Sequence, residues 1–208
     1  MWLLLTVLVV LGLLLVNEAW WRTSRAHGEL SRKFVHITVG SFVAFWPFFL
    51  SWREIIFLSG AFLVVICLSR YLDLFRAIHS VHRPTWGELF FALAVGLVAF
   101  ITRDEWIYMA ALLQMGLADG LAAVVGTTYG KRTRYRVFRH NKSLVGSVTF
   151  FVISAVILSV YAYFATVPLS PLFIIGLALG ATIIENIGVR GLDNLLVPLL
   201  IAVVLVNY

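Results

Sequence analysis

The sequence predicts an all-α integral membrane protein of about eight transmembrane helices. Hydrophobic residues make up 62% of the 208-residue chain and charged residues only 12%, and the mean hydropathy is +0.98. A soluble globular domain carries about twice that share of charge, so a soluble fold is excluded. The apolar residues also fall into segments of about 15–22 residues, close to the roughly 20 that a helix needs to cross a bilayer.

Eight such segments predict eight transmembrane helices in a single domain, residues 1–208. Short polar stretches separate them, with no long soluble insertion and no evident internal repeat. The segments are Trp2–Val16, Phe34–Leu50, Glu54–Leu68, Glu88–Ile101, Trp106–Val125, Leu144–Ala165, Pro171–Ile187 and Leu192–Val206.

The boundaries of the first four segments have local explanations. No basic residue precedes the first segment, and Asn17–Trp21 is typical of an interfacial belt rather than a cleavage site, so we expect this helix to be retained. Between the third and fourth segments, Tyr71–Arg83 places Arg and His at helical spacing among apolar residues, which predicts an amphipathic helix in the membrane interface. Pro84 ends that helix, and Glu88 complements the dipole of the next one. The single cysteine, Cys67, excludes an intrachain disulfide.

The basic residues predict the orientation of the chain. Of the 16 Lys and Arg residues, 14 lie in the loops that follow the first, third, fifth and seventh segments, and only Arg53 and Arg103 lie on the other side. The positive-inside rule then places these four loops in the cytoplasm and both termini outside. We therefore expect the functional residues in these loops to lie at the cytoplasmic face.

Asp119 is the most informative single residue. It lies inside an apolar segment, where an ionisable group costs roughly 2.5–3.5 kcal/mol and therefore indicates a functional role or a charged partner. Gly126 and Gly130 follow it, and then come the basic residues Lys131, Arg132, Arg134, Arg136, Arg139 and Lys142. This pattern indicates an anionic ligand, such as a nucleotide, at the membrane face. It is not an ATP-binding phosphate loop, because only three residues separate the glycines and Arg132 stands where Ser or Thr must hold magnesium.

Two further groups of residues have both a functional and an ordinary interpretation. Arg32, Lys33 and His36, where the first loop enters the second segment, form either a phosphate clamp with a titratable histidine or a common basic flank. Lys142 precedes Ser143 at the start of the sixth segment, which forms either an anion site at a helix N-terminus or a simple N-cap.

A third group surrounds the turn between the last two segments. Glu185 and Asp193 lie eight residues apart on either side of a short glycine-containing turn, and Asn194 follows. With Asp119 as a third oxygen donor, the two carboxylates can converge on a hard divalent cation. The alternative is a polar turn with helix caps.

The order of these motifs resembles that of a known family. RKFVH, GELFF, ADGLAAVVGTTYGK, NKSLVGS and EN…GLDNLLVP follow one another as in the CTP-dependent polyprenol and lipid kinases, which include dolichol kinase, phytol kinase and the CTP-dependent diacylglycerol kinase. The resemblance covers about residues 31–199, and its later part is distantly similar to the phosphatidate cytidylyltransferases. It implies a multi-helix membrane enzyme that binds CTP with Mg²⁺ and phosphorylates a long-chain lipid alcohol.

The resemblance also implies roles for individual residues. Asp119 and Asp193 would bind the metal, with Glu185 added from its spacing to Asp193, and Asp119, Lys142 and Asp193 would be catalytic. For the base that accepts the proton of the alcohol, His36 is the candidate because imidazole titrates near neutrality, with Glu88 or Glu185 as alternates. The nucleotide would be bound by Arg32, Lys33, Gly126, Gly130, Lys131, Ser143, Gly146 and Asn194.

One residue departs from the family pattern. Val145 stands where the family usually has Glu, before the glycine of the lysine motif. If that Glu helps to hold magnesium, either Glu185 replaces it or the chain performs another lipid reaction.

The expected partners are CTP, a long-chain lipid alcohol and membrane lipids, but not nucleic acid, and a homodimer is left open. Two alternative functions are a cytidylyltransferase that acts on a lipid phosphate and a non-enzymatic anion or lipid transporter or scaffold. The chain shows no paired halves such as many transporters have.

Overall fold

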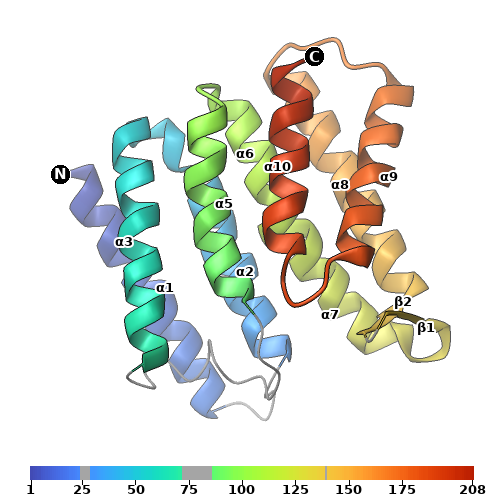
Figure 1. Ribbon diagram of the computed structural model, residues 1–208, viewed down its shortest axis with the longest axis horizontal. Coiled ribbons are helices and arrows are strands. Elements are labelled where there is room, and N and C mark those ends of the chain that lie inside the picture. The colour runs from blue at the N-terminus through green and yellow to red at the C-terminus, as the bar shows by residue number, and fades with distance from the viewer. Residues whose placement is uncertain (24–28, 72–85, 139) are drawn as a thin grey trace.

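The computed structural model describes residues 1–23, 29–71, 86–138 and 140–208. The helices stand side by side in one bundle, with both chain termini toward one end and a short hairpin at the other (Figure 1). The predicted amphipathic helix at Tyr71–Arg83 lies, apart from Tyr71, outside the described residues and stays a prediction.

Helices account for most of the described residues. Among the short ones, η1 and η3 are 3₁₀-helices and η2 is a π-helix. In chain order the elements are α1 (Trp2–Thr23), α2 (Glu29–Ala44), η1 (Trp46–Phe48), α3 (Trp52–Tyr71), α5 (Gly87–Ile101), α6 (Glu105–Leu113), η2 (Gln114–Ala118), α7 (Asp119–Tyr129), η3 (Gly130–Thr133), β1 (Arg134–Val137), β2 (His140–Ser143), α8 (Leu144–Phe164), α9 (Pro171–Ile187) and α10 (Asp193–Val206).

The apolar pattern predicted these helices well. Each of the eight predicted segments coincides with helical structure, and the seventh has the same bounds as α9. Among the described residues, Trp2–Trp20, Glu105–Thr133 and Leu144–Phe164 are long and apolar enough to cross a membrane, and α5, α9 and α10 are apolar but shorter. The protein is thus a helical membrane protein, whereas the count of eight membrane crossings stays a prediction.

Two predicted boundaries were wrong at the first loop. The first helix continues to Thr23 instead of ending at Val16, and the second begins at Glu29 instead of Phe34. Polar residues at a helix end that projects beyond the apolar layer remain helical, so a count of apolar residues underestimates the helix length. Consequently Lys33 lies inside α2, one turn before His36, rather than at the entry to the helix.

The second predicted segment also ends early. Pro47 lies in the 3₁₀-helix η1, and the α-helical conformation ends at Ala44, as expected near a proline that lacks a backbone donor.

A short hairpin, which the sequence analysis did not predict, is added to this helical fold. β1 and β2 pair antiparallel, with Arg134 opposite Ser143 and Val137 opposite His140. The burial of β1 alternates, since Arg134 and Arg136 are exposed while Tyr135 and Val137 are half-buried. This alternation is the usual signature of a strand. The strand is only four residues long and lies within a basic segment, so the pattern is too short to be recognised in the sequence.

The rod of α6, η2 and α7 forms the centre of the bundle. Tyr108, Leu112 and Met115 are almost completely buried along it. By contrast, α8 exposes a stripe of valines at every fourth position: Val148, Val152, Val156 and Val160. An apolar stripe of this kind on the outside of a bundle suits contact with lipid chains.

Close contact between two backbones fixes α2 against the central rod. A Cβ atom added to Gly116 in η2 would lie 2.9 Å from the carbonyl carbon of Gly40 in α2. Only glycines permit such an approach, as is common where membrane helices cross. The crossing places α2 alongside the start of α7, where Asp119 lies.

Candidate active site

Three carboxylates from separate helices converge at one place. Asp119 begins α7, Glu185 lies near the end of α9 and Asp193 begins α10. One carboxylate oxygen from each lies within 4.8 Å of the others. Asp119 and Glu185 are buried, and Asp193 is half-buried. Such a set of oxygen donors has the composition that a hard divalent cation prefers.

Two lysines compensate two of these charges. The Lys33 ammonium pairs with Asp119 Oδ2, and both side chains are buried. The Lys142 ammonium pairs with Glu185 Oε1 and also donates to the backbone carbonyl of Glu185, at 3.0 Å. Buried charges are costly unless they are paired, so each lysine stabilises the carboxylate that it contacts. The cluster therefore combines three acids with two bases.

Lys142 lies in β2, and the charged groups of this cluster shift its pKa. Burial by itself lowers the pKa of Lys142, but attraction to Glu185 and Asp193, the hydrogen bond to Glu185 and attraction to Asp119 together outweigh it. The pKa of Lys142 is therefore raised above its usual 10.5. The ammonium stays protonated at neutral pH and carries a permanent positive charge into the site.

A hydrogen-bonded network ties the hairpin to the helices beside the carboxylates. Tyr135 of β1 donates its hydroxyl proton to Asn186 Oδ1, and Ser147 of α8 donates to the same oxygen at 3.0 Å. Asn186 in turn donates to the carbonyl of Thr182 at 2.9 Å. Because Asn186 follows Glu185, this network fixes the end of α9 at the site. The sequence analysis assigned no role to Tyr135, whose sole signal was its alternation with arginines.

Two glycines, Gly126 of α7 and Gly146 of α8, bring these helices together. A Cβ atom on Gly126 would lie 2.8 Å from Ser143 Oγ, and one on Gly146 would lie 3.0 Å from the carbonyl oxygen of Ala122. Ser143 caps α8, since its Oγ accepts a hydrogen bond from the Gly146 amide at 3.1 Å. These residues therefore have a structural role, and their predicted contact with a nucleotide is a separate proposal.

The turn between α9 and α10 docks on the start of α5. The side-chain amide of Asn194 donates to the carbonyl of Gly87 at 3.1 Å, and the backbone amide of Trp86 donates to the carbonyl of Arg190 at 3.0 Å. Gly191 has a φ of +92° and approaches Gly87 so closely that its Cβ atom would lie 2.5 Å from the Gly87 Cα. These contacts place Asp193 beside the element that carries Glu88. The Asn194 Oδ1 atom is buried and has no hydrogen-bond partner among the described residues.

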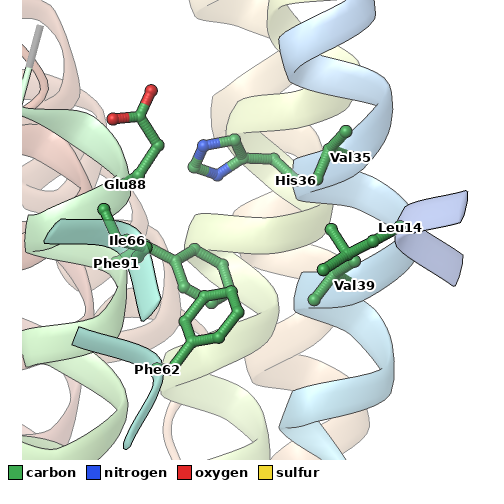
Figure 2. Close-up of a pocket in the computed structure, with 8 residues that line it drawn as sticks. All are labelled: Leu14, Val35, His36, Val39, Phe62, Ile66, Glu88 and Phe91. Atoms are coloured by element: carbon green, nitrogen blue, oxygen red, sulfur yellow. The ribbon is translucent and has the colours of Figure 1, made fainter. Parts of the chain in front are cut away.

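A pocket adjoins the carboxylate cluster. Figure 2 shows that the imidazole of His36, from α2, and the carboxylate of Glu88, from α5, lie at one end of it, with Phe62 and Phe91 beyond them. The pocket contains about 420 Å³ of empty space, part of it open to the surroundings. The His36 ring meets the Phe91 ring edge-on at a centroid distance of 5.3 Å and is within electrostatic reach of Asp119. His36 thus lies between the pocket and the cluster.

Similarity to a known protein identifies the family. Over 199 residues, the chain is 36% identical to a phytol kinase of Synechocystis sp., a match that covers 90% of this chain and 83% of the relative. The chain belongs to the phytol kinase family. Its sequence matches no family model and no solved structure. Membership of the phytol kinase family confirms the resemblance based on the order of the motifs, and the more distant likeness to cytidylyltransferases stays a prediction.

For some of the predicted site residues, the structure shows no contact with the carboxylate cluster among the side chains that it describes. Lys131 is exposed on η3. The side chain of Arg32 lies outside the described part of the structure, although its backbone belongs to α2. Val145 is half-buried in the first turn of α8, next to the hairpin that presents Lys142. Their roles toward a nucleotide stay predictions.

Proposed function

We propose that this protein transfers a phosphoryl group from CTP to a long-chain lipid alcohol of the isoprenoid class, to which phytol belongs. Membership of the phytol kinase family supports the reaction class. The convergence of Asp119, Glu185 and Asp193 with two lysines is the observation that carries the proposal. Phosphoryl transfer is catalysed mainly by positioning and charge compensation, and this cluster has the groups for both.

The donor set fits a magnesium ion. Asp119, Glu185 and Asp193 offer oxygen ligands from three helices, and the unpartnered Asn194 Oδ1 belongs to the residue next to Asp193. When bound, Mg²⁺ would neutralise phosphate charge and orient the transferring group. Glu185 would then supply the carboxylate that is missing at Val145.

The two lysines have the right charge and position to contact phosphates. Lys33 and Lys142 reach the cluster from α2 and from the hairpin, and each pairs with a different carboxylate. An ammonium group at this place can exchange a carboxylate partner for a phosphate oxygen without leaving the site. Charge developing on the phosphate oxygens during transfer would then be stabilised by groups that are already in position.

His36 is suited to accept the proton of the alcohol. It is buried one helical turn after Lys33 and lines the pocket opposite Glu88. Imidazole has an unperturbed pKa near 6.5, which suits a general base at neutral pH. Glu88 is the alternate base in the same pocket.

We place the reaction at the cytoplasmic face. The loops that carry 14 of the 16 basic residues follow the odd-numbered predicted segments, and Figure 1 draws the hairpin and the α9–α10 turn at the end of the bundle away from the C-terminus. The positive-inside rule assigns that end to the cytoplasm, where CTP is available.

The experiment that tests this function follows the label of CTP. The purified protein is incubated with phytol, dolichol, undecaprenol or diacylglycerol, or with the corresponding phosphates, in detergent with Mg²⁺. We expect label from γ-labelled CTP, in preference to ATP, to enter an organic-extractable product. Label from α-labelled CTP in that product would instead indicate a cytidylyltransferase. No product from any of these substrates would contradict both and leave a transporter or scaffold.

A further inference from the structure

Two adjoining cavities lie between α1, α2, α3 and α5. The first is the pocket described above, and the second contains about 270 Å³ of empty space. Val39, Phe62 and Phe91 line both cavities and form their common boundary. The second cavity extends from this boundary to Trp46 and Val43.

The polarity of these cavities is strongly one-sided. His36 and Glu88 bring polar groups to one end of the first cavity, and its other lining residues are apolar. In the second cavity, the Ser59 hydroxyl is already committed to the carbonyl of Ala92, at 2.8 Å. The remaining walls of the second cavity are apolar except for the indole nitrogen of Trp46. The pair of cavities therefore suits a molecule with one small polar end and a long hydrocarbon chain.

We propose that the two cavities together form the acceptor site, in which the alcohol hydroxyl lies between His36 and Glu88 and the isoprenoid chain passes Val39, Phe62 and Phe91 toward Trp46. This inference rests on the proposed function and names the place where its lipid substrate binds. It also assigns Trp46, at the far end, the role of limiting the length of the chain.

The position of the polar end relative to the cluster supports this assignment. Lys33 and His36 lie one turn apart on α2, Lys33 contacts Asp119, and His36 contacts Phe91 at the cavity boundary. A hydroxyl held by His36 would therefore lie beside the carboxylate cluster while its hydrocarbon chain remained in the apolar interior. A single turn of α2 thus connects the phosphate side of the site to the lipid side.

Filling the boundary tests the acceptor site kinetically. We expect Val39→Phe to raise the KM for phytol at least tenfold and to leave the KM for CTP within twofold, since the added ring occupies the path of the chain. The control is Val64→Phe on the exposed side of α3, which should change neither constant. An unchanged KM for phytol in Val39→Phe would overturn the inference.

A second variant tests the far end. Trp46→Ala lengthens the second cavity, so we expect the ratio of kcat/KM for an alcohol longer than phytol to that for phytol to rise at least threefold. An unchanged or lower ratio would remove the assigned role of Trp46.

Photo-crosslinking tests the site without relying on catalysis or on the folding of a variant. The wild-type protein is illuminated with an isoprenoid alcohol that carries a diazirine at the end of its chain, in the absence of nucleotide. We expect label in Val43–Trp46, where α2 ends and η1 begins, and in Leu58 of α3, which lines the same cavity, with competition by excess phytol. Label at these residues in a protein that shows no phosphoryl transfer in the CTP assay would retain the acceptor site and reject the kinase. Phosphoryl transfer in that assay together with label elsewhere would retain the kinase and reject this site.

Discussion

At the scale of single residues, the site is governed by the pairing of charges. The spacing of Glu185 and Asp193 around a short turn allowed them to converge with Asp119 on a cation, with a capped polar turn as the alternative, and the structure brings the three carboxylates together. The sequence did not predict that Lys33 pairs with Asp119, which lies 86 positions away. Such a pairing depends on which helices cross, and the crossing of Gly40 with Gly116 leaves no distinctive pattern in the sequence.

Asp119→Asn should remove most of the activity and lower the stability of the protein. The substitution leaves Lys33 buried without an anionic partner, which typically costs about 3–5 kcal/mol. We expect activity to fall at least a hundredfold and the thermal unfolding midpoint in detergent to fall. The double variant Asp119→Asn with Lys33→Met should recover the midpoint but not the activity. Recovery of activity in the double variant would exclude Asp119 from the metal site.

Asp193→Asn separates metal binding from helix packing. Asp193 is half-buried, and the structure brings its carboxylate to the other two at the start of α10. We expect Mg²⁺-dependent binding of CTP to be lost while the protein still inserts into membranes and purifies normally. Binding assays at increasing Mg²⁺ check this, and an unchanged Mg²⁺ dependence would show that Asp193 does not hold the metal.

The raised pKa of Lys142 predicts how its ion pair responds to pH. A base whose folded-state pKa is raised stabilises the fold fully below its unfolded value, near 10.5, and loses this contribution as the pH rises through the folded value. The difference in unfolding midpoint between the wild type and Lys142→Met should therefore be constant from pH 7 to about 9.5 and shrink above about 10.5. A difference that already shrinks between pH 7 and 9 would contradict the raised pKa.

At the scale of elements, the apolar pattern located the helices, whereas the hairpin and the exact helix ends had to come from the structure. Pro171 and the apolar run that follows it predicted α9 to the residue. The hairpin falls in a predicted basic loop, and its strands of four residues are too short to leave a clear alternating pattern. The bond between Tyr135 and Asn186 and the pairing of Lys142 with Glu185 hold the hairpin against α9, and no local pattern records contacts across 51 and 43 positions.

Tyr135→Phe tests whether the hairpin positions Glu185. The loss of a hydrogen bond of this kind typically costs about 0.5–1.5 kcal/mol. Since Asn186 is the neighbour of Glu185, we also expect kcat to fall several-fold with little change in the KM for phytol. Tyr129→Phe, at an exposed position on α7, should leave both stability and kcat unchanged. Equal effects of the two substitutions would show that the network has no positioning role.

Gly116→Ala tests the crossing between α2 and the central rod. The added methyl group meets the backbone of Gly40 at about 2.9 Å, so the two helices must separate. We expect lower thermal stability and loss of activity, since the separation also draws Lys33 away from Asp119. Gly176→Ala is a matched control, because a Cβ atom there has no neighbour within 4 Å and alanine favours helices by about 0.5–1 kcal/mol over glycine. A stability loss at Gly176 of the same size would show that the crossing is not special.

At the scale of the whole molecule, apolar and charged side chains occupy different parts of the helical bundle. Apolar side chains such as the valine stripe of α8 cover the outside, and the acids and their lysines gather where α7, α9, α10 and the hairpin meet. Composition alone predicted the membrane class, and membership of the phytol kinase family gives the bundle its reaction class. The orientation in the bilayer still depends on the distribution of Lys and Arg alone.

Single cysteines test that orientation. Thr133 and Thr166 are exposed, and they lie beyond opposite ends of α8, the helix that joins them. In a Cys67→Ser background, we expect Thr133→Cys to react with an impermeant reagent only after the membrane is opened and Thr166→Cys to react from outside the intact cell. Reaction of both residues from the outside would mean that α8 does not cross the membrane.

The π-helical turn of the central rod also bears on how the family changes in length. In η2 the backbone amide of Asp119 bonds to the carbonyl of Gln114, five positions earlier instead of four. The turn therefore accommodates one more residue than an α-helical turn. A chain that lost one residue between Gln114 and Ala118 could close this turn into a regular α-helix and keep its aspartate at the cluster, whereas a deletion after Asp119 would rotate the rest of α7 by about 100°. Gains and losses of single residues among the relatives should therefore concentrate in η2, where the helix can absorb them.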